Sequence, residues 1–121
     1  MLKNFLLVFL GGGLGSVTRY IISKFDFFNA PPIINTIIIN VIGSFLIGLI
    51  LGFALKSESS NSNYILFLTT GFCGGFTTFS AFSEESLKLL SDGSYYMFFS
   101  YIFSSVILGI ISVYFGYALF K

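Results

Sequence analysis

The chain has 121 residues, of which 55% are hydrophobic and only 9% are charged. Soluble domains carry about 25% charged residues, and a soluble chain of this length could not bury so much apolar surface. The net charge of +1 excludes a typical nucleic-acid binder, and the apolar content excludes a disordered chain. The sequence has no histidine and one cysteine, which removes the commonest general base and a cysteine metal cluster. Composition therefore predicts a small integral membrane protein and not an enzyme.

Uncharged runs predict four transmembrane helices in a single domain that covers residues 1–121. A helix needs about 20 apolar residues to cross the bilayer, and residues 33–55, 59–83 and 93–120 carry no charge. We place the spans at roughly 4–23, 33–54, 64–87 and 95–120. Because three spans follow the first apolar run, we expect that run to be a retained helix and not a signal peptide. The predicted fold class is an all-α integral membrane protein.

The positive charges divide evenly between the two faces of the membrane. Four spans place both termini on one face with Lys3, Lys56 and Lys121, and leave Arg19, Lys24 and Lys88 on the other. The bias that normally fixes orientation is therefore missing. Either a weak bias is resolved by other details, or the protein inserts both ways. Insertion both ways would allow an antiparallel dual-topology homodimer about an axis in the membrane plane.

Small and polar residues interrupt the first two spans. Gly11 and Gly15 lie four residues apart, which predicts a helix face that lets another backbone approach closely. Arg19 follows them, either as a snorkelling anchor or as a positive charge at the mouth of an anion path. Asn40 lies inside the second span, where its amide must find an interhelical partner or face a wet cavity. Its NH₂ group is also a neutral donor that suits an anion.

The third span contains the most unusual stretch, GFCGGFTTFSAFS, at residues 71–83. Adjacent glycines and β-branched threonines weaken a helix, so we predict that this helix is broken in mid-span. Broken backbone at bilayer depth survives only where protein or a cavity satisfies its polar groups. The freed carbonyl oxygens suit a hard cation such as Na⁺.

Two phenylalanines in this stretch, Phe79 and Phe82, are three residues apart and share one helix face. They either pack in the core or turn their positive ring edges toward an anion. Hydroxyls of the third and fourth spans accompany them, namely those of Thr78, Ser80, Tyr101 and Ser105. A lining of hydroxyls, one amide and aromatic edges, without fixed charge, suits a small anion that must enter and leave.

The string GFCGGFTTFSAFSEE closely resembles the signature of the Fluc-type fluoride ion channels, the CrcB family, and the segments GGGLGSVTRY and IINVIGSFLIG agree with it. The resemblance implies an antiparallel homodimer with two fluoride pathways. It places pathway residues at Asn40, Phe79, Phe82, Tyr101 and Ser105, vestibule residues at Arg19 and Glu85, and a structural Na⁺ on the backbone carbonyls of Gly74 and Thr77.

The resulting hypothesis is a passive channel in the bacterial cell membrane that exports fluoride and lowers its cytoplasmic concentration. Its expected partners are fluoride, Na⁺, a second copy of the chain and the lipid bilayer, with no nucleic acid. One alternative is a small multidrug–proton antiporter, which needs an acid deep in the membrane. No acidic residue precedes Asp26, and the second and fourth spans contain none. The other alternative is a membrane assembly subunit that transports nothing.

Overall fold

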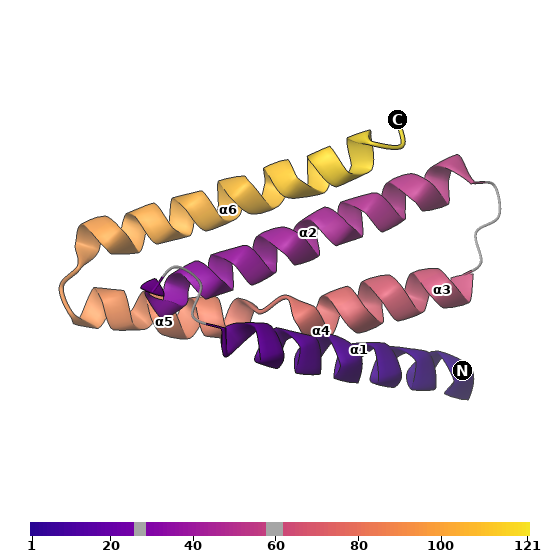
Figure 1. Cartoon of the computed structure of the whole chain (residues 1–121), viewed down its shortest axis with the longest axis horizontal. Helices are drawn as coiled ribbons and strands as arrows, with labels where there is room; N and C mark the ends of the chain where they lie inside the picture. Colours follow the sequence, from indigo (N-terminus) through magenta and orange to yellow (C-terminus); the bar gives the residue numbers. More distant parts are fainter. Residues whose placement is uncertain (26–28, 58–61) are drawn as a thin grey trace.

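The computed structural model describes residues 1–25, 29–57 and 62–121, and these residues form a bundle of long helices (Figure 1). Parts of two predicted connectors, residues 26–28 with Asp26 and residues 58–61, lie outside the described residues. The described part contains four helical stretches that are long and apolar enough to cross a membrane: α1 (Leu2–Ser23), α2 (Pro32–Lys56), Ser62–Ser91 and α6 (Tyr95–Ala118). The prediction of an all-α protein with four such helices is confirmed. The ends differ from the predicted ones by a few residues, because helix ends fray and the sequence marks them poorly.

The third stretch is divided into several pieces. It begins as α3 (Ser62–Leu66), continues as the π-helical segment η2 (Phe67–Cys73) and the short α4 (Gly74–Phe76), and resumes as α5 (Phe79–Ser91). Thr77 and Thr78, between α4 and α5, have extended backbone, with φ/ψ of −76°/155° and −143°/112°. The π-helix is a rare conformation that concentrates at functional sites.

The glycines of α1 bring its backbone directly against the third stretch. A Cβ atom at Gly11 would collide with the Phe67 carbonyl oxygen, and one at Gly15 would collide with that of Phe72. Gly75 lies against the backbone of Gly12 in the same way. The predicted small-residue face of α1 is therefore confirmed, and it fixes α1 beside η2 and α4.

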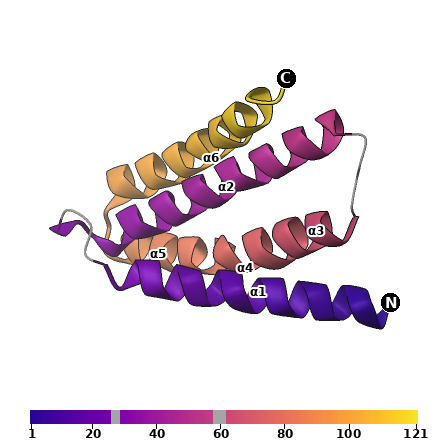
Figure 2. The ribbon, with the colours of Figure 1, turned by 45° about the vertical axis from the view of Figure 1, so that its right-hand side comes forward.

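Helices α2 and α6 pack together as a second pair and are parallel to each other (Figure 1). A Cβ atom at Gly48 would meet the Val113 carbonyl oxygen, and one at Gly116 would meet that of Phe45. The two pairs form two layers, and α2 diverges from α3 toward the end that carries both termini (Figure 2). Close glycine packing within each pair thus leaves the space between the pairs to larger polar and aromatic side chains.

Candidate functional site

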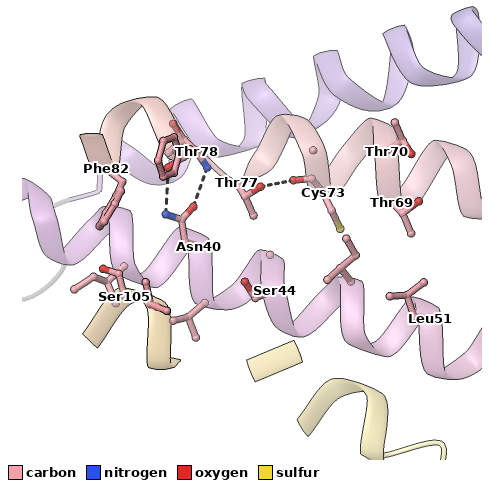
Figure 3. A pocket seen from close by; sticks show the side chains of 17 residues that line it. Asn40, Ser44, Leu51, Thr69, Thr70, Cys73, Thr77, Thr78, Phe82 and Ser105 are labelled. Atoms are coloured by element: carbon pink, nitrogen blue, oxygen red, sulfur yellow. Dashed lines mark hydrogen bonds between the residues drawn. The ribbon is translucent and has the colours of Figure 1, made fainter. Parts of the chain in front are cut away.

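A groove of about 780 Å³ lies between α2, the third helical stretch and α6 (Figure 3). We call it the central groove. None of its lining residues is charged. Its polar lining consists of the side chains of Asn40, Ser44, Thr69, Thr70, Thr77, Thr78 and Ser105. The groove therefore offers hydroxyl and amide groups in an otherwise apolar wall.

The carboxamide of Asn40 holds the extended backbone between α4 and α5. Its Nδ2 donates to the Thr78 carbonyl oxygen at 3.2 Å, and its Oδ1 accepts from the Thr78 N–H at 2.8 Å (Figure 3). Only one of the two Nδ2 hydrogens is needed for this pairing, so the second remains available to the groove. Asn40 therefore replaces the helical partners that an interrupted backbone loses.

The side chain of Thr78 caps the first turn of α5. Its Oγ1 accepts from the Ala81 N–H at 3.1 Å and lies 3.1 Å from Ser80 Oγ. In a continuous α-helix the Thr78 N–H would bond to the Gly74 carbonyl and the Ala81 N–H to the Thr77 carbonyl. Both donors are diverted, so these two carbonyl oxygens lose their helical hydrogen bonds.

The Gly75 carbonyl also has side-chain donors in place of a helical one. Arg19 Nε donates to it at 3.2 Å and Ser16 Oγ at 3.4 Å, both from α1. The guanidinium group thus places a positive charge beside the end of α4. Arg19 does not line the central groove.

Three aromatic rings follow one another from the groove into the protein. The ring centroids of Phe79 and Phe82 are 5.7 Å apart, and those of Phe82 and Tyr101 are 5.1 Å apart. Tyr101 is buried, whereas Phe79 is 80% exposed. Phe82 is therefore fixed by its neighbours, while Phe79 stands at the open side of the groove.

The carboxyl group of Glu85 connects three helices. Its Oε1 accepts from Thr36 Oγ1 of α2 at 2.8 Å, and its Oε2 accepts from the Tyr101 hydroxyl of α6 at 2.6 Å. Thr36 and Tyr101 are both buried. Hydrogen bonds to a carboxylate are stronger than neutral ones, so this cluster joins α5 to both helices of the second pair.

The structure brings most of the predicted site residues to one place. The central groove is lined by Asn40, Gly74, Thr77, Thr78, Phe79, Phe82 and Ser105. The other four predicted residues lie beside it: Ser80 contacts Thr78, Tyr101 contacts Phe82, Glu85 contacts Tyr101, and Arg19 contacts Gly75. In the described part of the chain, Ser105 Oγ is buried and has no hydrogen-bond partner.

The sequence prediction did not assign four further polar residues to the site. Ser44, Thr69 and Thr70 line the groove, and Thr36 binds Glu85. Helical spacing contains part of this signal, because Ser44 follows Asn40 by four residues and so shares its face. The contact between Thr36 and Glu85 joins distant parts of the chain and has no local signal.

Comparison with known proteins places the chain in a family. The family model described as "CrcB-like protein, Camphor Resistance (CrcB)" matches residues 6–117. The chain belongs to the CrcB family. A relative from Phocaeicola vulgatus is 48% identical over 120 residues, which cover 95% of this chain and 96% of the relative. This relative is named fluoride-specific ion channel FluC, and so is a second relative, described next.

That second relative, from Azobacteroides pseudotrichonymphae, is 40% identical over 125 residues, with 98% of this chain and 97% of the relative covered. A protein of the same name from Pyrococcus abyssi is 38% identical over 118 residues and is covered to 96%. Family membership and the four apolar helices together make this CrcB chain a multi-pass membrane protein.

Proposed function

We propose that this CrcB protein is a fluoride channel that lets the anion leave the cell passively. The observation that carries the proposal is an uncharged groove lined by donors and aromatic rings, in a chain whose relatives are named fluoride-specific ion channels. Fluoride enters a cell as the weak acid HF, which dissociates inside and traps the anion. A negative interior favours its exit by about 2.3 kcal/mol at 100 mV, so the protein needs no energy source.

The groove chemistry suits an anion that must be bound weakly. The unpaired Ser105 hydroxyl and the second Nδ2 hydrogen of Asn40 provide neutral donors. Phe79 and Phe82 add ring edges, which carry partial positive charge. A fixed positive charge would hold fluoride too tightly. Selectivity for fluoride therefore rests on the density of hydrogen-bond donors and on the width of the passage.

The open side of the groove supports an antiparallel homodimer. Phe79 and Gly74 line the groove and are exposed in the single chain, so a second copy would close the passage. The even division of positive charges supports insertion of the two copies in opposite orientations. We place this dimer in the bacterial cell membrane, with the interrupted third helix at the depth of the hydrocarbon layer.

A structural Na⁺ at the dimer interface fits the carbonyl oxygens of Gly74 and Thr77. Both have lost their helical donors to Asn40 and Thr78, and neutral backbone oxygens are ligands that a hard monovalent cation accepts. When bound, Na⁺ would neutralise the partial negative charge of carbonyls gathered from both copies. Na⁺ is not transported in this proposal.

A liposome assay tests the proposal directly. The purified protein is reconstituted in KF-loaded vesicles, external fluoride is followed with an electrode, and valinomycin starts the efflux. We expect fluoride efflux well above that of empty vesicles, and efflux equal to that of empty vesicles would refute the channel. Proton-coupled dye transport without fluoride flux would instead indicate the antiporter, and no flux of any kind would indicate an assembly subunit.

A further inference from the structure

A lysine at the end of α2 and another just after the end of α6 line the same hollow, away from the central groove. Lys56 and Lys121 both line a hollow of about 180 Å³, together with Tyr117 and Phe120. The end of α6 packs closely against Gly52 of α2. A Cβ atom at Gly52 would lie 2.8 Å from the Tyr117 carbonyl oxygen and 3.3 Å from Phe120 Cβ. This packing holds the residues just before Lys121 against α2.

Neither lysine is neutralised within the described residues. The ion pair found there joins Lys88 to Glu84 at 2.9 Å, on α5. The described acidic residues Glu84, Glu85 and Asp92 all belong to α5 or its C-cap, which Figure 1 places at the opposite end of the bundle. Among the described residues, no acidic side chain therefore lies at the end of the bundle where these two lysines line a hollow.

An apolar hollow of about 530 Å³ adjoins the charged one and shares Phe120 with it. It lies between the end of α2 and the start of the third stretch, and its walls include Ile50, Phe53, Tyr64 and Leu68. The rings of Phe53 and Phe120 meet edge to face, with centroids 5.7 Å apart. A hollow lined by two lysines next to an apolar hollow is complementary to a molecule with an anionic head group and a hydrocarbon tail.

We propose that this end of the chain binds an anionic phospholipid, with its phosphate between Lys56 and Lys121 and an acyl chain in the apolar hollow. Basic hollows between membrane helices bind anionic head groups in this way. A lysine near a helix C-terminus also interacts favourably with the helix dipole. Because that interaction exists with or without a bound lipid, it does not account for a preference for anionic lipid. The site is independent of the fluoride pathway.

Native mass spectrometry of the full-length protein tests this site. The protein is exchanged into micelles with equal amounts of phosphatidylglycerol and phosphatidylcholine, and the retained lipid is counted. We expect wild type to retain phosphatidylglycerol preferentially and the double variant Lys56→Gln/Lys121→Gln to lose on the order of tenfold in this preference. The matched control Lys3→Gln/Lys24→Gln removes the same charge elsewhere and should keep it.

Two further measurements complete the test. Thermal unfolding of each variant identifies loss of fold, and a variant that unfolds is replaced by Lys56→Gln alone. Glycerol phosphate, which has the head group but no acyl chain, should fail to displace phosphatidylglycerol. The proposal is overturned if the double variant keeps the preference, if the control loses it equally, or if glycerol phosphate competes as well as the lipid.

Discussion

Asn40 pairs through its single side chain with both backbone polar groups of Thr78, one bond at 2.8 Å and the other at 3.2 Å. This is the pairing that a neighbouring β-strand would supply. In a membrane helix an unpaired backbone group costs several kcal/mol, so extended backbone at this point depends on a partner from α2. The amide is at once a support for the interruption and part of the groove wall.

Replacing Asn40 with leucine should destabilise the protein and reduce fluoride efflux. The Thr78 N–H and carbonyl would both lose a partner while Thr78 stays buried, at roughly 1–3 kcal/mol for each group. Thermal unfolding in detergent and liposome efflux measure the two effects. Ser44→Ala is the control, because Ser44 lines the same groove without supporting the backbone. Equal stability of Asn40→Leu and Ser44→Ala would contradict the supporting role.

Substitution of either phenylalanine should slow fluoride efflux, but substitution of Phe82 should destabilise the protein more than substitution of Phe79. Phe79→Ile and Phe82→Ile each remove an aromatic edge from the groove, so we expect slower fluoride efflux from both. Phe82 also packs on Tyr101 at 5.1 Å, and loss of such a ring pair costs about 0.5–1.5 kcal/mol beyond the lost apolar burial. Phe79 also lies 5.7 Å from Phe82, but at 80% exposure it has less packing to lose within one chain. Unchanged efflux in both variants would remove the aromatic-edge mechanism.

The spans could be predicted from the sequence because they depend on composition along a line. A run of uncharged residues is visible one residue after another, and so is the four-residue spacing of Gly11 and Gly15. The contacts of Asn40 and Glu85 are different, because they join residues that lie far apart in the chain. The extended backbone between α4 and α5 depends on the contact with Asn40. Local helix propensity gives no information about that contact. The resemblance indicated which residue types gather at the site, but not which backbone groups they hold.

The hydrogen bond between Tyr101 and Glu85 should appear as a coupling energy. Tyr101→Phe removes the donor at 2.6 Å, and Glu85→Gln replaces one carboxylate oxygen with an NH₂ group. Each single variant should unfold more easily, and the double variant should lose less than the sum. Hydrogen bonds to charged groups contribute about 1.5–3 kcal/mol, so we expect a coupling of that order from four unfolding curves. Strict additivity would show that the two residues act separately.

A matched pair of glycine substitutions tests the contact between α1 and the third stretch. Gly15→Ala places a Cβ atom against the Phe72 carbonyl oxygen and 2.8 Å from the Phe76 nitrogen, and the backbone cannot yield without separating the helices. Gly13→Ala meets nothing within 4 Å, and alanine in an exposed helix is favoured by about 1 kcal/mol over glycine. We expect the melting temperature to fall sharply for Gly15→Ala and to hold or rise for Gly13→Ala. Equal shifts for both would mean that the close approach does not occur.

Removal of Na⁺ should weaken both the stability and the activity of the protein. If the Gly74 and Thr77 carbonyls of two copies hold the ion, bound Na⁺ stabilises the folded dimer by mass action, by about 2.7 kcal/mol at a concentration 100 times the dissociation constant. The melting temperature should therefore rise with added NaCl at constant ionic strength, with N-methylglucamine chloride as the balancing salt. Fluoride efflux should fall after prolonged dialysis against Na⁺-free buffer and recover when Na⁺ is restored. Potassium serves as the control for a general salt effect, and equal stabilisation by potassium and sodium would show that no site selective for the smaller ion exists.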